Sequence, residues 1–193
     1  SAYSTSPSMF QRTRPQRRSS GSLCPVRFTL RRKSSPMPSL TLGGRLLLIS
    51  DHMPFPGAAA PLAAAFGCTF NDGFAIKEFR TEEEGRGLFT SPNIFSRNTG
   101  SLRTHVITDG VVSGAAVTQI ATFAGQAFRC SDAAEPLLVL PGDFVSLMPE
   151  RPWQFTLQTL SVPVGGWLQG AALDFGSGRA AVFGEAGLFS AQI

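Results

Sequence analysis

The sequence lacks several features that would place it at once in a functional class. No run of eighteen uninterrupted apolar residues occurs, so no membrane span is expected. No apolar segment follows the basic residues near the start, so the sequence predicts no secretory signal peptide. Histidine occurs only twice, which restricts acid–base chemistry and histidine-ligated metal sites to very few positions.

Cysteine is also scarce, and its spacing indicates neither a redox motif nor a metal site. Cys24, Cys68 and Cys130 form no CxxC pair and do not have the spacing of metal ligands. Cys68 and Cys130 lie among apolar residues, where a buried and unreactive thiol is the usual state. We therefore expect these two residues to be inert thiols in the core.

Acidic residues are absent from the first forty-two positions, which carry eight basic residues. The remaining residues carry nine basic and thirteen acidic side chains, a formal charge of −4. The basic pI therefore describes the beginning of the chain and not the rest, and it does not predict a nucleic-acid-binding domain.

Residues 1–42 are rich in Ser, Arg and Pro and show no sustained hydrophobic period. Such a segment buries too little apolar surface to offset its ordering entropy, so we expect a disordered tail. It could be a basic arm for nucleic acid or acidic lipid, or an organellar transit peptide. The interpretation we favour is out-of-frame coding sequence, because the composition changes abruptly at a well-patterned strand.

The patterned part of the chain predicts alternating strands and helices. The apolar run at 45–49, bounded by glycine, is typical of a buried parallel strand, and the alanine-rich stretch from Ala58 to Phe66 predicts a helix capped by Gly67. Further strands are expected on both sides of the Asn71-Asp72-Gly73 turn, and at 117–123, 136–140 and 153–160.

The last part of the chain gives the clearest pattern. Two strand-like runs, 166–175 and 179–183, lie on either side of Gly176-Ser177-Gly178 and predict a hairpin. A short helix is expected to begin at Leu188. Together these elements favour an α/β sheet with some antiparallel pairs.

Three segments resemble the class I glutamine amidotransferase-like superfamily, nearest its gliding-motility and intraflagellar-transport group and the bacterial proteins of domain of unknown function 4350. They are Gly44–Ile49 with the helix that follows, the stretch from Leu102 to Gly110, and Gly178–Glu185. In the second segment Val106 stands where the group has proline. The match covers residues 43–193.

The resemblance implies a three-layer, flavodoxin-like α/β domain with a mostly parallel sheet and a C-terminal hairpin. It also implies that one strand–helix unit is missing before Gly43, so that the domain is N-terminally truncated. Many relatives are exported. The family's nucleophilic cysteine on a strand-to-helix elbow is absent, because no Gly-x-Cys-x-Gly or Gly-x-Ser-x-Gly segment occurs and Cys68 follows a helix. Glutaminase activity is therefore not expected.

Ligands of open α/β sheets bind at the carboxyl ends of the strands. Asp51 and His52 follow one predicted strand and Glu185 follows the last, so these three side chains are the candidate site, with Gln126 as a further ligand-binding candidate at the same rim. The alternative is that Asp51 and Glu185 cap local backbone N–H groups and that Gln126 is a buried, satisfied amide. His105 and the two tryptophans, Trp153 and Trp167, are interpreted as packing residues.

Three functions fit these candidates. The first is a non-catalytic domain that binds a small molecule, such as a carbohydrate, or a protein partner at the strand ends. The second is a hydrolase, metal-assisted or not, in which His52 acts as base or ligand and Asp51 and Glu185 assist it. The third is an interaction module that docks a partner on an exposed apolar patch including Phe55. No cofactor is indicated.

Overall fold

The computed structural model describes residues 40, 42–78, 92–111, 113–156 and 158–190. The expected tail falls outside this range except for Leu40 and Leu42. Leu40 is buried in the core, so ordered packing begins slightly before the expected boundary at Gly43. In chain order the elements are β1 (Arg45–Ile49), α2 (Phe55–Ala65), β2 (Cys68–Phe70), β3 (Phe74–Lys77), β4 (Asn93–Ser96), β5 (Gln119–Thr122), β6 (Phe128–Cys130), β7 (Glu135–Val139), β8 (Phe144–Met148), β9 (Leu160–Pro163), β10 (Leu168–Phe175), β11 (Gly178–Phe183) and the 3₁₀ turn η1 (Gly187–Phe189).

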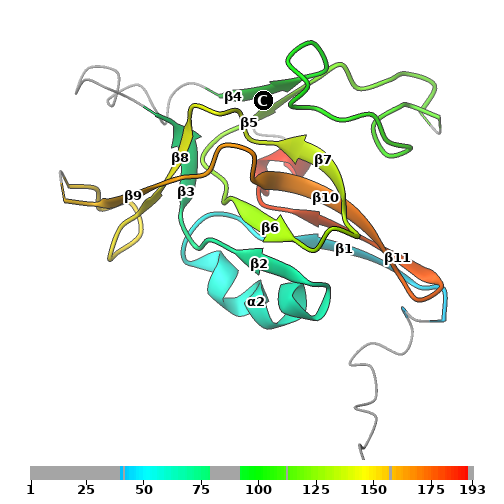
Figure 1. Ribbon diagram of the computed structural model, residues 1–193, viewed down its shortest axis with the longest axis horizontal. Coiled ribbons are helices and arrows are strands. Elements are labelled where there is room, and N and C mark those ends of the chain that lie inside the picture. Colours follow the sequence, from blue (N-terminus) through cyan, green and yellow to red (C-terminus); the bar gives the residue numbers. More distant parts are fainter. Residues whose placement is uncertain (1–39, 41, 79–91, 112, 157, 191–193) are drawn as a thin grey trace, which may run out of the picture. The chain divides into compact units, whose positions relative to one another are not determined.

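The largest sheet is mixed, with few helices beside it, and it curls into a half-barrel (Figure 1). Its strand order is β1-β11-β10-β6-β2, and β7 pairs with β10 as well. Among the described strands, only β1 and β11 pair in parallel, so the expected mostly parallel sheet is wrong. A tight turn forces antiparallel pairing only for β10 and β11, around the predicted Gly-Ser-Gly turn, whereas pairs such as β2·β6 and β3·β8 join strands far apart in the sequence.

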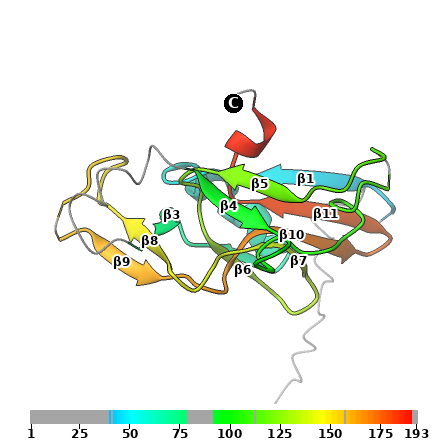
Figure 2. The ribbon, with the colours of Figure 1, turned by 90° about the horizontal axis from the view of Figure 1, so that it is seen from above.

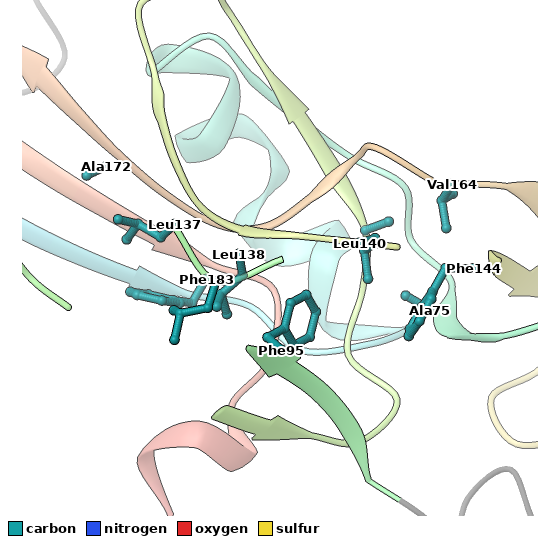
Figure 3. Close-up of a cluster of buried hydrophobic side chains, with 11 residues drawn as sticks. Ala75, Phe95, Leu137, Leu138, Leu140, Phe144, Val164, Ala172 and Phe183 are labelled. Atoms are coloured by element: carbon teal, nitrogen blue, oxygen red, sulfur yellow. The ribbon is translucent and has the colours of Figure 1, made fainter. Parts of the chain in front are cut away.

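The two faces of this sheet are covered by different elements. On one face Leu48, Ala171 and Val182 pack with Ala63 of α2 and Phe66 beyond it. On the other face Ala172 and Phe183 pack with Phe95 of β4. Side chains of β10 and β11 alternate between these two cores, as the period of a strand requires. Figure 2 shows β4 and β5 as a layer over β10 and β11, and Figure 3 shows Phe95 beside Leu138 and Phe183.

Helix α2 begins three residues before the expected Ala58, and the difference changes the role of its prolines. Pro56 occupies the first turn, where a missing N–H costs nothing, whereas Pro61 lies inside the helix. The chain leaves the helix as predicted, because Gly67 has a φ of +72° and its N–H donates to the Ala64 carbonyl. No described helix has the length and apolar character of a membrane span.

A second sheet has the order β3-β8-β9 and its own small core of Phe74, Ile76, Val145 and Leu147. Strands β2 and β3 flank the Asn71-Asp72-Gly73 turn as predicted, but each pairs in a different sheet.

Other strand predictions had mixed outcomes. Strand β5 falls within its predicted range and β7 overlaps its own, beginning one residue earlier at Glu135. The described residues of 153–159 form no strand, β9 meets the predicted 153–160 only at Leu160, and β4, β6 and β8 were not predicted. The alternation in 153–159 reflects aromatic packing around Phe74 and not a ladder. Of the predicted last helix, the described residues form only the 3₁₀ turn η1.

Cys68 and Cys130 form a disulfide, so the prediction of two inert thiols is wrong. They are 62 residues apart in sequence but directly opposite each other in the antiparallel pair β2·β6. Neither the spacing nor the apolar neighbours indicated this, because the pairing of β2 with β6 is a tertiary contact. The bond fastens the chain that leaves α2 to the strand that follows Gln126. Cys24 lies outside the described residues.

Removing this bond is expected to lower stability substantially. A disulfide that closes a loop of 62 residues restricts the unfolded chain, which predicts a loss of about 2–4 kcal/mol in the free energy of unfolding for the double variant Cys68→Ala/Cys130→Ala. Urea denaturation with and without dithiothreitol measures this. The reductant should destabilise wild type and Cys24→Ala equally and leave the double variant unchanged. Equal sensitivity of all three proteins would contradict the disulfide.

Candidate functional site

The site lies at the carboxyl ends of the parallel strands β1 and β11. Their register places Ile49 beside Phe183, and the Ser50 N–H donates to the Phe183 carbonyl at 2.9 Å. The chain therefore leaves both strands at the same edge of the sheet, so the residues that follow them meet. Asp51, His52 and Glu185 line one cavity of about 250 Å³, together with Phe123, Ala124, Trp153, Ala186, Gly187 and Ser190.

The Glu185 side chain, of which only 3 % is exposed, is held by backbone N–H groups from two segments. Oε2 accepts hydrogen bonds from Phe123 at 2.9 Å and Gly125 at 3.0 Å, and Oε1 accepts one from Gly187 at 2.9 Å. Burial raises the pKa of this carboxyl, the nearby Asp51 charge raises it further, and the three N–H donors oppose the rise. The bond to Gly187 matches the expected capping role, whereas the bonds across to Phe123 and Gly125 were not expected.

Asp51 and His52 present different groups to the cavity. Asp51 Oδ1 accepts the His52 backbone N–H at 2.7 Å, which is the local capping alternative. The His52 ring places Nδ1 2.7 Å from the Met53 carbonyl oxygen, so Nδ1 is the protonated nitrogen in the neutral ring. Its Nε2 has no hydrogen-bond partner among the described residues. The ring stacks on Phe74 at 4.6 Å between centroids, which fixes its plane.

Trp153 was interpreted as a packing residue, and it does pack on Phe74, but it also lies in the wall of the cavity with 52 % of its surface exposed. Its ring meets the edge of His52 at 4.7 Å. Its backbone has a φ of +64°, a conformation that bulky residues rarely adopt and that is found disproportionately at functional sites. No signal in the sequence identified it, because its position depends on the loop between β8 and β9.

Gln126, the fourth predicted ligand-binding residue, does not line the cavity. It is completely buried, its Nε2 donates to the Ser50 carbonyl at 3.1 Å, and its backbone N–H donates to the Gly184 carbonyl at 2.7 Å. Its Oε1 has no partner among the described residues. Ser50 precedes Asp51 and Gly184 precedes Glu185. Gln126 therefore holds the backbone next to both carboxylate residues without lining the cavity itself.

The segment from Phe123 to Ala127 holds the surrounding elements together. Asn93 of β4 donates to the Phe123 carbonyl, Ala75 of β3 donates to the Gly125 carbonyl at 2.7 Å, and Asn71 donates to the Ala127 carbonyl at 3.0 Å. With the bonds to Glu185 and Gly184, this one stretch contacts the large sheet, the β3-β8-β9 sheet and the sheet formed by β4 and β5. The cavity is therefore built on a rigid support.

His105 lies away from this cavity and has the structural role expected of it. Its Nδ1 accepts the Ile107 N–H at 3.0 Å, and Nε2 lies 3.6 Å from a carboxylate oxygen of Glu135. It lines a larger hollow of about 860 Å³ beside β1 and β11, together with the exposed Val106 and Ile107.

The described residues contain no group of three or more His, Cys, Asp or Glu side chains arranged to hold a metal ion. Asp51, His52 and Glu185 share a cavity, but the oxygens of Glu185 face backbone N–H donors. The fold and site thus define a mixed α/β domain with a small, aromatic-lined acidic cavity. Comparison with protein-family models and with curated proteins finds no match to this chain.

The raised pKa of Glu185 predicts the sign of a pH effect. The folded protein binds this proton more tightly than the unfolded chain, so the contribution of Glu185 is most favourable below its ordinary pKa of 4.5 and is lost as pH rises through the raised pKa. The free energy of unfolding of wild type minus that of Glu185→Gln should therefore increase as pH falls from neutral to 4.5. Denaturation at several pH values measures it, with Asp143→Asn as control. A difference that decreases on acidification would contradict the raised pKa.

Gly125 has no room for a side chain. A Cβ there would lie 2.3 Å from the Gly184 carbonyl oxygen and 2.8 Å from the Glu185 Cβ. Gly125→Ala is expected to displace the segment that binds Glu185 and to lower the free energy of unfolding by about 1–3 kcal/mol. Gly142→Ala is the control, because nothing lies within 4 Å of its Cβ position. Equal stability of the two variants in urea denaturation would show that the close packing at Gly125 is not real.

Proposed function

We propose that this domain binds a small ligand in the cavity at the ends of β1 and β11 and does not transform it. The observation that carries the proposal is the convergence of Asp51, His52 and Trp153 around one hollow of about 250 Å³. Asp51 and His52 come from the loop after β1 and Trp153 from the loop after β8, and they offer a carboxylate, an imidazole nitrogen and an aromatic face. A concave site with aromatic walls and a few polar groups is typical of ligand binding.

The size of the cavity limits the ligand. Sites for drug-sized molecules usually occupy about 300–1,000 Å³, so this one suits a single sugar ring or a small polar headgroup. A carbohydrate would stack one face on Trp153 and donate hydroxyl hydrogen bonds to Asp51. Glu185 contributes its charge more than its lone pairs, since both of its oxygens already accept backbone hydrogen bonds.

The hydrolase interpretation has less support. A general acid or base must reach the substrate with a free lone pair or proton. Glu185 is held by three backbone N–H groups, so it is poorly placed to exchange a proton. His52 directs Nδ1 to the Met53 carbonyl oxygen and keeps Nε2 as the remaining base of the described lining. The metal-assisted form would need ligands that no cluster of described residues supplies.

A second candidate is a module that docks a protein partner. Exposed apolar side chains favour it: Phe55, which is 57 % exposed, lies beside His52, and Val106 and Ile107 line the larger hollow. Grouped exposed apolar residues are typical of interaction surfaces. The two candidates are compatible, because the larger hollow lined by Val106 and Ile107 shares no lining residue with the cavity of Asp51 and Trp153.

The relationship to amidotransferase-like, flavodoxin-like proteins also remains a proposal. A parallel pair formed by β1 and the last strand β11, with helix α2 directly after β1, supports it. The antiparallel pairing of the other described strands departs from that fold, so the proposal is confined to these three elements.

Ligand binding can be tested with a panel of methyl glycosides, small amines and carboxylic acids added to the full-length protein. Binding to the folded state should raise the melting temperature, since a ligand at a hundred times its Kd adds about 2.7 kcal/mol to stability. The same ligand should shift the indole Nε1–H resonance of Trp153, and its thermal effect should disappear in Trp153→Leu. The control is Trp153→Phe, which keeps an aromatic face. If no panel member moves either signal, the proposal is wrong.

A further inference from the structure

Among the described residues, the lining of the cavity holds two carboxylates and no arginine or lysine. Asp51 and Glu185 both line it, and neither forms an ion pair with any described residue. Other acids of the described chain, such as Asp109, Glu135, Asp143 and Asp174, each lie within 4 Å of a basic side chain. His52 is the one basic side chain in the described part of the lining, and in its neutral form it supplies no opposite charge to either carboxylate.

Aromatic rings form much of the remaining wall. Phe123 and Trp153 line the cavity and are partly exposed, and the His52 ring stands edge-on to Trp153. The negative face of an aromatic ring attracts a cation within about 6 Å of its centre, and Trp attracts it most strongly. Carboxylates and aromatic faces together are complementary to a positive charge that also has apolar surface.

We propose that the ligand of this cavity is a small organic cation with a methylated ammonium group. This inference rests on the proposed ligand-binding function and names the chemical class of the ligand. The methyl groups contact the rings of Trp153 and Phe123, and the positive charge faces Asp51 and Glu185.

The hydrogen bonds of the site favour a methylated ammonium over a guanidinium or a primary amine. A guanidinium needs a carboxylate with two free oxygens in one plane to form its bidentate pair. Glu185 has little acceptor capacity left, because Oε2 accepts two bonds, from Phe123 and Gly125, and Oε1 accepts one from Gly187. Asp51 Oδ1 accepts the His52 N–H, which competes with a bidentate pair there. A quaternary ammonium has no N–H group and so needs no hydrogen-bond acceptor. The negative charges of Asp51 and Glu185 alone stabilise it. Burial raises the pKa of Glu185 most and the Asp51 charge raises it further, and a bound cation would oppose the second effect.

The test compares choline with its neutral carbon analogue 3,3-dimethylbutan-1-ol, which has the same shape without the charge. Binding to the full chain is measured by titration calorimetry at pH 8, where an ordinary imidazole is neutral. We expect choline to bind and the neutral analogue to bind about tenfold more weakly or not at all. Guanidinium should also bind more weakly than choline.

Three variants identify the site. Asp51→Asn should weaken choline binding about tenfold, whereas Asp143→Asn, which removes an exposed acid on another element, should not change it. Trp153→Leu should weaken binding about fivefold, and Trp153→Phe should restore most of it. The melting temperature of each variant without ligand separates lost binding from lost folding.

The possible results separate this inference from the function on which it rests. If a methyl glycoside or the neutral analogue binds as well as choline and depends on Trp153, the domain binds ligands but the cationic class is wrong. If choline binds equally to Asp51→Asn, the inference is also overturned. If neither the cation nor any glycoside binds to wild type, both the inference and the proposed function fail.

Discussion

The buried carboxylate of Glu185 is the interaction on which the arrangement of this domain depends. It accepts backbone N–H groups from Phe123, Gly125 and Gly187, and so it joins the end of β11 to the segment between β5 and β6. A buried charge is costly unless hydrogen bonds satisfy it, and here three donors do so. Because that segment also bonds to β3 and β4, the position of one carboxylate fixes how three sheets meet.

The disulfide and Gln126 support the same region from the other face of the large sheet. Cys68 and Cys130 join the strand after α2 to the strand after Gln126, and Gln126 itself bonds to Ser50 and Gly184. The loop carrying Asp51 and His52 is therefore fixed at both ends, by β1 and by α2. A loop that is already fixed in this way loses little conformational entropy when a ligand binds to it.

The chemistry of the cavity depends on which hydrogen-bonding groups of its side chains are already used by the surrounding backbone. Backbone donors occupy the oxygens of Glu185 and the Met53 carbonyl occupies Nδ1 of His52, so little hydrogen-bonding capacity remains. What the described lining still offers is negative charge, the second oxygen of Asp51, Nε2 of His52 and the exposed part of Trp153. Charge and aromatic surface in a cavity wall are typical of ligand sites, which is the basis of the proposed binding function.

The sequence by itself determined the local elements: β1 as an apolar run between glycine and polar residues, the capped end of α2 at Gly67, and the hairpin around Gly176-Ser177-Gly178. It also indicated that Asp51, His52 and Glu185 follow strands, because a strand ends where its hydrophobic pattern ends. Only the tertiary structure decided that most strands pair antiparallel, that Cys68 meets Cys130, that Gln126 lies behind the cavity, and that Trp153 lies in its wall. These outcomes depend on contacts between residues far apart in the chain, which local propensity and periodicity do not encode.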